Sequence, residues 1–453
     1  MSLTGNSNRD SFGSKFGILA AAAGSAVGLG NVWKFPYVTG QNGGGAFLLI
    51  YLACVFLLGV PVMLSEFSIG RRAQRNVFGS FKALAPHTPW YFVGIMGVVA
   101  AFVILSFYSA VAGWTLEYVI RAVDGSFQSS EPLSSAFSNF IVHPFRPIIW
   151  QTVFMILTAL IVAGGIKNGI EKYNKILMPL LVVFLLILCV RAVTLPNSFE
   201  GLKFLFSPDF SKITAKTILF AMGQAFFSLS LGMGALITYS SYFKKSENLG
   251  VTAVNVSIAD TAIAILAGVV IFPAVFAFNI EPSAGPSLVF ITLPEIFRQM
   301  PLGSLFGFIF FVLLSVAALT STVSVLEVVV AYFSEEFKIS RKKAIIIASG
   351  SISILGVLAS LSFGPLSNVL IFKKSIFDLL DFTASNVLLP LGGLLIVIFV
   401  GWYMTSADIK DEVSNSGSLK VKFFPYYIFI VRFIAPLAIA AIFIYSIFYG
   451  SLG

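Results

Sequence analysis

Long apolar stretches follow one another along almost the whole chain, and they limit the possible folds more than any other feature. A helix needs about 20 apolar residues to cross the hydrocarbon of a bilayer, so stretches of this length predict membrane-spanning helices. Charged residues make up only 11% of the 453 residues, whereas a soluble domain has about 25%. The sequence therefore predicts an all-α, polytopic membrane protein in a lipid bilayer. The eleven predicted spans cover residues 13–38, 42–70, 88–122, 147–163, 171–193, 215–242, 251–280, 297–333, 341–362, 376–404 and 426–449.

Positive charge is distributed unevenly between the segments that join these spans. If the N-terminus is cytoplasmic, the inner segments collect most of the Lys and Arg residues. Cytoplasmic segments of membrane proteins carry such an excess, so we expect a cytoplasmic N-terminus, an outer C-terminus and a location in the cell (inner) membrane. The cations are scattered singly and in short clusters, and the net charge of +9 therefore does not indicate a nucleic-acid partner.

The sequence carries no pattern typical of catalysis or of metal ligation by His and Cys. Cys54 and Cys189 lie inside apolar stretches, while His87 and His143 are far apart. Neither an HExxH nor a GxSxG context occurs at bilayer depth. We therefore expect a protein that is not an enzyme. A channel or a substrate-gated receptor would need a continuous polar pore, and the thick apolar stretches along the chain argue against one.

Two of the predicted spans are interrupted by glycines and polar residues. The first contains GSAVGLGN (residues 24–31), and the sixth contains SLSLGMG (residues 228–234). Unwound backbone at bilayer depth is tolerated only where it is buried in protein or lines a cavity. Either segment alone is also compatible with close helix packing through small residues. Two such breaks, five spans apart, favour a transporter whose site lies at the middle of the membrane.

Oxygen-bearing side chains recur at the depth of these breaks. They are Asn31, Ser228, Asp260, Thr320 and Ser321. A buried carboxylate without an adjacent cation is costly, so Asp260 is expected to meet a bound ion, a proton or a substrate amine. A protonated or water-bridged packing residue is the structural alternative. Helix N-termini and freed carbonyls together suit an amino acid zwitterion.

Other charged residues are embedded in the spans or at their ends. Glu66 is expected to bind the freed backbone groups of the broken helices, whereas no substrate role is assigned to Glu327. Weak ion pairs suit gates because they must break in every transport cycle. The two candidate gates are Lys34 with Asp381 at the outer end, and Arg9 with Glu335 at the inner end.

The sequence resembles the neurotransmitter:sodium symporter family over essentially its whole length. The motifs that carry the resemblance are residues 24–31, 35–36 (FP), 42–47 (NGGGAF), 223–235 (GQAFFSLSLGMGA) and 317–321 (AALTS). Bacterial members of this family are the standard example of paired broken helices, so the breaks are not independent support. The eleven spans are similar to those of the bacterial amino acid transporters in the family. The resemblance implies one transmembrane domain (1–453), with inverted repeats over 13–193 and 215–404 and a peripheral span at 426–449.

The resemblance also implies two sodium sites and a substrate site between the broken helices. The first sodium site would use Ala26, Asn31, Ser228, Asp260 and the substrate carboxylate. The second would use Gly24, Val27, Ala317, Thr320 and Ser321. The substrate would contact Ala26, Leu29, Gly30, Ile104, Tyr108, Phe227, Ser228, Ser230, Met233 and Val325.

The activity implied is sodium-coupled import of a hydrophobic L-amino acid by alternating access. A proton-coupled transporter or exchanger that uses Asp260 or Glu327 is the alternative. Met233 replaces a phenylalanine of the bacterial leucine transporter, and its flexible thioether should accept varied side chains.

Five positions bear on the mechanism. Lys34 stands where the family usually has arginine, which removes a bidentate contact to Asp381. Asp260 stands where many members have asparagine, and Ala264 where chloride-dependent members have serine, so transport is expected to be chloride-independent. Gly169 and Pro179 are similar to a motif linked to unwinding of span five and inward release of sodium.

Overall fold

The computed structural model describes residues 10–128, 131–278 and 287–449, and within them the chain is helical, with no strand beyond an isolated bridge. Nine of its helices are long and apolar enough to cross a membrane. They are Gly45–Ala73 (α3, η2 and α4), Tyr91–Val123 (α6), Arg146–Ala163 (α8), Ile166–Val193 (η4 and α9), Leu249–Ala277 (α13), Gly303–Glu336 (α15), Arg341–Leu361 (α16), Ile376–Tyr403 (α17, η7, α18 and η8) and Phe424–Phe448 (α20, η9 and α21).

The first predicted span is present as a bent pair of helices. α1 (Lys15–Ala26) ends at Val27, whose backbone is extended. The chain resumes as η1 (Gly30–Lys34) and α2 (Phe35–Gln41), and the two parts are bent by 55°. With this pair, ten spans are counted in the described residues.

The sixth predicted span is also present in two pieces, and this is where the expected number of eleven differs from the count of ten. α11 (Ala215–Ser228) has 14 residues and α12 (Ala235–Ser240) has 6. At 1.5 Å per residue neither reaches the ~30 Å of hydrocarbon alone. Between them the backbone takes positive φ at Ser230, Gly232 and Gly234. The positive φ values explain why helix stops here and why two of the positions are glycine.

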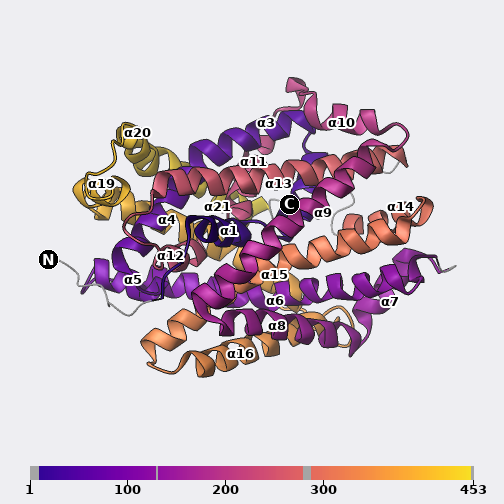
Figure 1. Ribbon diagram of the computed structural model, residues 1–453, viewed down its shortest axis with the longest axis horizontal. Coiled ribbons are helices and arrows are strands. Elements are labelled where there is room, and N and C mark those ends of the chain that lie inside the picture. Colours follow the sequence, from indigo (N-terminus) through magenta and orange to yellow (C-terminus); the bar gives the residue numbers. More distant parts are fainter. Residues whose placement is uncertain (1–9, 129–130, 279–286, 450–453) are drawn as a thin grey trace.

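Short helices lie at the two ends of the bundle, as Figure 1 shows. One end carries α5 (Val77–Leu84) and α19 (Ser406–Val413), which belong to the cation-rich joining segments. The other end carries α7 (Leu133–Val142), α10 (Ser198–Phe206) and α14 (Leu293–Gln299). The joining segments therefore alternate between the two ends, as the predicted span order requires.

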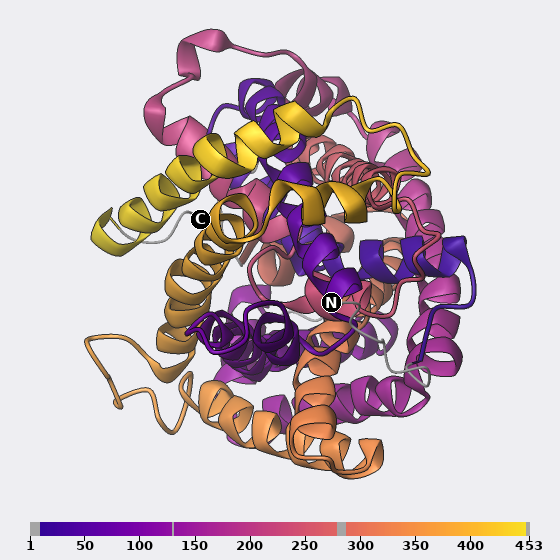
Figure 2. The ribbon, with the colours of Figure 1, turned by 90° about the vertical axis from the view of Figure 1, so that its left-hand side faces the viewer.

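The interior is built around α15, which packs along α6, α9 and α1. α16 and α21 (Ala435–Tyr449) lie at the periphery on opposite sides of the end-on view in Figure 2. Large apolar side chains are exposed on both helices, including Ile346 and Ile354 at 70% and Leu437 at 74%. Exposed apolar residues on this scale suit a surface solvated by lipid.

A buried arginine joins the end of α4 (Val60–Ala73) to α19. The Nε of Arg71 donates to Glu412 Oε2 at 2.8 Å, and its other nitrogens donate to the carbonyls of Glu247 and Glu412 and to Asn415 Oδ1. The side chains of Arg71 and Glu412 are both fully buried. This contact ties residues near the start of the chain to residues near its end.

Candidate functional site

The first group of predicted ligands meets around the carboxylate of Asp260, which α13 holds in the interior. Oδ1 accepts from Asn31 Nδ2 at 2.6 Å, and Oδ2 accepts from Ser228 Oγ at 2.7 Å. Tyr51, which the sequence did not single out, contributes a hydroxyl that donates to Ser228 at 3.4 Å. Asp260 is fully buried, and these donors are neutral side chains. The carboxylate thus carries no cationic partner in these contacts.

Asn31 also closes the end of the first broken helix. Its Oδ1 accepts from Gly28 N at 3.0 Å, while its nitrogen faces Asp260 and Ser228. The side chain thus satisfies a backbone donor that the break has freed. The amide oxygen points at the backbone in this arrangement, and a half-turn of the amide would turn it toward the carboxylate.

The second group of predicted ligands lies where α15 crosses the first break. The carbonyl of Val27 accepts from Ser321 Oγ at 2.9 Å and from Thr320 Oγ1 at 3.5 Å. Thr320 also donates to the carbonyl of Ala317 at 3.0 Å. The close approach depends on Gly28, because a Cβ there would lie 2.5 Å from Ser321 Oγ. Four of the five predicted ligands are thereby in direct contact.

Gly24, the fifth ligand, packs beside them. A Cβ on Gly24 would lie 3.2 Å from the Cβ of Thr320. A bulkier residue would therefore push α1 away from α15, so the glycine sets the distance between the two helices.

The predicted substrate residues surround the same break. Tyr108 OH accepts from Leu29 N at 3.0 Å, and Ser230 Oγ donates to the carbonyl of Ser25 at 2.9 Å. Gly30 lies against the ring of Phe227, since a Cβ there would approach it to 2.9 Å. Several other predicted contacts belong to one apolar cluster, namely Ala26, Ile104, Phe227, Met233 and Val325. The structure thus brings polar members of the predicted site to the first break, while these five residues belong to the large apolar core of the bundle.

The second break is held by Glu66 from α4. Its Oε1 accepts from Gly232 N at 2.8 Å, and its own carbonyl accepts from Ser240 Oγ at 3.4 Å. Glu66 is fully buried. This is the contact with freed backbone that its position in the sequence suggested.

Both residues of the predicted outer gate lie in the described part of the chain. Lys34 and Asp381 line one small cavity of about 40 Å³, but no ion pair within 4.0 Å joins them in the described part of the chain. The Nζ of Lys34 lies 4.1 Å from the ring centroid of Phe227, and Asp381 accepts from Ser385 at 2.9 Å.

Arg9, one partner of the predicted inner gate, lies outside the described residues. The other partner, Glu335, accepts from the backbone and side chain of Asn76 at 2.8 and 3.0 Å. Glu335 therefore stands at the end of the bundle that carries α5.

Glu327 has an ionic partner that the sequence did not indicate. Its oxygens accept from Arg341 at 2.5 and 3.0 Å and from Tyr242 OH at 2.8 Å. Arg341 begins α16 directly after the turn that follows α15. The only available signal was an embedded acid followed by a cation across a short turn.

The predicted release segment is helical throughout in this structure. Gly169 lies in η4 (Ile166–Glu171), and Pro179 lies inside α9 (Lys172–Val193). Between them Glu171 accepts from Gly13 N at 2.6 Å and from Ser14 Oγ at 2.9 Å. The segment is thereby tied to the start of α1.

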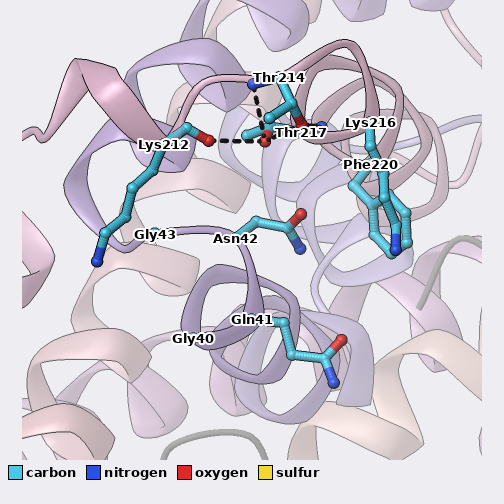
Figure 3. A pocket seen from close by; sticks show the side chains of 9 residues that line it. All are labelled: Gly40, Gln41, Asn42, Gly43, Lys212, Thr214, Lys216, Thr217 and Phe220. Carbon is cyan, nitrogen blue, oxygen red and sulfur yellow. Dashed lines mark hydrogen bonds between the residues drawn. The ribbon is translucent and has the colours of Figure 1, made fainter.

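A pocket of about 720 Å³ lies apart from these residues, beside the N-terminus of α11 (Figure 3). Thr217 Oγ1 donates there to the carbonyl of Lys212 at 3.2 Å. The lining residues are Gly40, Gln41, Asn42, Gly43, Lys212, Thr214, Lys216, Thr217 and Phe220. None of them belongs to the predicted site.

Several known proteins are similar to this chain over most of its length. A bacterial relative, an uncharacterized sodium-dependent transporter of Bacillus subtilis, is 42% identical over 433 residues, which are 95% of this chain and 96% of the relative. A second, from Haemophilus influenzae, is 40% identical over 98% of this chain and all of the relative. The crystal structure of MhsT in complex with L-phenylalanine is similar with a TM-score of 0.89 and 51% identity, and the match covers 96% of this chain and 99% of that one.

The family assignment follows from a match over most of the sequence. The pattern of the Sodium:neurotransmitter symporter family matches residues 9–139 and 137–451. This confirms the family resemblance, the sodium dependence and the expectation that the protein is not an enzyme. The chain therefore belongs to the sodium:neurotransmitter symporter family of membrane transporters.

Proposed function

We propose that this protein imports a hydrophobic L-amino acid together with two sodium ions, by alternating access and without chloride. The observation that carries the proposal is the meeting of two oxygen-rich groups at the first break, one around Asp260 and one around the carbonyl of Val27. Both lie beside an apolar cluster that includes Met233 and Val325.

The first sodium ion is proposed to bind Ala26, Asn31, Ser228 and Asp260. The buried carboxylate has neutral donors in the described contacts, and a cation compensates such a charge best. A half-turn of the Asn31 amide supplies its oxygen to the ion. The substrate carboxylate completes the coordination, so ion and amino acid each strengthen the binding of the other.

The second sodium ion is proposed to bind Gly24, Val27, Ala317, Thr320 and Ser321. The contacts of Thr320 and Ser321 with the carbonyls of Val27 and Ala317 already place these oxygens together. A bound ion replaces the hydroxyl protons as the partner of the carbonyls, and the hydroxyl oxygens turn toward the ion.

The substrate is proposed to bind by its carboxylate to the N–H groups of Leu29 and Gly30 and to the Tyr108 hydroxyl. Its amine is proposed to bind the carbonyls of Ala26, Phe227 and Ser228 and the Ser230 side chain. The wall formed by Ile104, Phe227, Met233 and Val325 favours an apolar side chain. The similar structure of MhsT holds L-phenylalanine, which supports this choice.

Chloride is proposed to be unnecessary because the carboxylate of Asp260 supplies a fixed negative charge beside the first ion. Ala264, four residues further along α13, is fully buried and brings no hydroxyl. Uptake that depends on chloride would contradict this part of the proposal.

Residues 13–193 and 215–404 are proposed to form inverted repeats whose rearrangement opens the site to one side of the membrane and then to the other. The N-terminus is proposed to be cytoplasmic and the C-terminus to lie outside. Lys34 with Asp381 and Arg9 with Glu335 are the proposed outer and inner gates. Unwinding between Gly169 and Pro179 is proposed to let water reach the second ion and release it inward.

Proton coupling is the competing function. Of its two candidate groups, Glu327 is already paired with Arg341 through two hydrogen bonds, which weakens a role as proton carrier. Asp260 remains the group through which a proton would act.

Uptake into proteoliposomes separates the two functions. Radiolabelled hydrophobic amino acids are offered under an inward sodium gradient or an inward proton gradient. We expect uptake only with sodium, and uptake that persists undiminished in sodium-free buffer would exclude the proposal.

The variant Asp260→Ala tests the first sodium site in the same assay. Because it removes a charged ligand from a buried site, we expect sodium-stimulated substrate binding to fall by about a hundredfold. Asp260→Asn, which keeps one oxygen, should reduce this binding less. Unchanged sodium dependence in Asp260→Ala would exclude Asp260 as a ligand.

A further inference from the structure

The side chain of Asn174 carries an oxygen that the proposed sites do not use. Asn174 lies on α9 and is 2% exposed. Its Nδ2 donates to the carbonyl of Ile170 at 2.8 Å, while its Oδ1 has no hydrogen-bond partner among the described residues. Buried side-chain oxygens nearly always accept a hydrogen bond or bind an ion, so this one calls for an explanation.

The unpartnered oxygen points at the second group of ligands. A Cβ built on Gly24 would lie 2.4 Å from Asn174 Oδ1 and 3.2 Å from Thr320 Cβ. The oxygen therefore lies against α1 at Gly24, on the side that packs against Thr320, whose hydroxyl contacts the carbonyls of Val27 and Ala317. The bond from Nδ2 to Ile170 fixes the amide in the orientation that presents the oxygen to this region.

The position of Asn174 along the chain connects it to the release segment. It lies between Gly169 and Pro179, three residues after Glu171, which holds Gly13 and Ser14 at the start of α1. Residues three apart on a helix share a face. One face of this segment therefore packs along α1, with Glu171 at the first residues of α1 and Asn174 at Gly24.

We propose that the Oδ1 of Asn174 binds the second sodium ion on the inner side of its site and forms its first contact on the way to the cytoplasm. This inference rests on the proposed function, because it takes the second sodium site and the cytoplasmic N-terminus as given. A neutral amide oxygen is a suitable sodium ligand, and binding an ion satisfies the oxygen that the protein leaves without a donor. When the segment unwinds, the oxygen moves with it and draws the ion away from Val27.

Two substitutions of Asn174 separate an ion ligand from a packing residue. Asn174→Ala removes both the oxygen and the bond to Ile170. Asn174→Asp keeps an oxygen and adds charge, but a carboxylate cannot donate to Ile170. An ion ligand therefore predicts that alanine impairs sodium binding and aspartate restores it, whereas a structural role through Nδ2 predicts that both variants are impaired alike.

The experiment measures the sodium concentration for half-maximal binding of labelled L-phenylalanine to the purified full-length protein. We expect Asn174→Ala to raise this concentration about tenfold and Asn174→Asp to leave it at or below the value of the unsubstituted protein. Asn168→Ala is the matched control, because it makes the same change at an exposed amide in the same segment, and it should change nothing.

The release of ²²Na⁺ from preloaded protein gives a second readout. Asn174→Asp should slow this release, since a carboxylate holds the ion more strongly than an amide does. The inference would be overturned if sodium-dependent binding were equally impaired in both variants, or if Asn174→Ala left the sodium concentration for half-maximal binding unchanged. Either result would leave the proposed function intact. Sodium-independent binding by the unsubstituted protein would overturn both.

Discussion

The two broken helices differ in which side chains bind the backbone groups that each break frees. In the first break, Asn31 caps Gly28 from within the same segment, and the chain resumes helix after a bend of 55°. In the second, a longer stretch with three positive φ values is held by Glu66 from another span. The first break has a cap from its own segment in addition to contacts from Tyr108, Ser230 and Ser321, while the second takes its cap from Glu66 on another span. We therefore expect changes at the first break to act mainly on the sodium concentration for half-maximal uptake, and changes at the second to act mainly on the maximal rate.

Among changes at the two breaks, the largest effect is expected from removing Glu66, which supports the second break from another span. Glu66→Ala leaves the N–H of Gly232 buried without an acceptor, which costs about 1–3 kcal/mol. We expect the maximal uptake rate in proteoliposomes to fall by about thirtyfold, with a much smaller change in the sodium concentration for half-maximal uptake. Glu66→Gln keeps an acceptor oxygen and should retain most of the activity. If glutamine is as harmful as alanine, the charge and not the hydrogen bond supports the break.

A substitution at the first break is expected to have a smaller effect, on the sodium requirement instead of the maximal rate. Gly28→Ala places a methyl group 2.5 Å from Ser321 Oγ and 3.0 Å from Tyr108 OH, and such overpacking costs about 1–3 kcal/mol. The sodium concentration for half-maximal uptake should rise about tenfold. Size-exclusion chromatography should show that the variant remains folded. Gly350→Ala is the control, because no atom lies within 4 Å of the added methyl. The comparison between the breaks fails if Gly28→Ala lowers only the maximal rate.

The smallest effect is expected at the substrate wall near the second break. Met233→Ile replaces a flexible thioether by a stiff β-branched side chain, and such swaps usually cost under about 1.5 kcal/mol. Competition between phenylalanine and leucine for uptake should shift about threefold toward leucine. Met155→Leu, at a buried methionine on α8, should leave the ratio unchanged. An unaltered ratio in Met233→Ile would place the substrate side chain elsewhere.

The sequence predicted the spans and the breaks well because both depend on local composition. Ten of the spans lie close to their expected bounds, and glycines located the breaks between α1 and η1 and between α11 and α12. The number of spans was harder to define, since the sixth is two helices that are each too short to cross.

Contacts between distant residues were less predictable. The pairing of Glu327 with Arg341 and the hydroxyl of Tyr51 beside Ser228 depend on how helices pack, which a single residue in an apolar stretch does not indicate. Asn174 left no clear signal, because it is the fourth residue of the predicted span 171–193 and lies between Lys172 and Lys175, where polar residues are common.

The buried arginine between α4 and α19 has a consequence for synthesis. Arg71 and Glu412 are 341 residues apart, so at ribosomal rates of about 5–20 residues per second the cation waits on the order of tens of seconds for its partner. During that time the end of α4 cannot be buried, because an unpaired guanidinium would have to leave water. We therefore expect the nascent chain to keep this end of the bundle hydrated, and to complete its packing only after the span Ile376–Tyr403 and the α19 that follows it have been made.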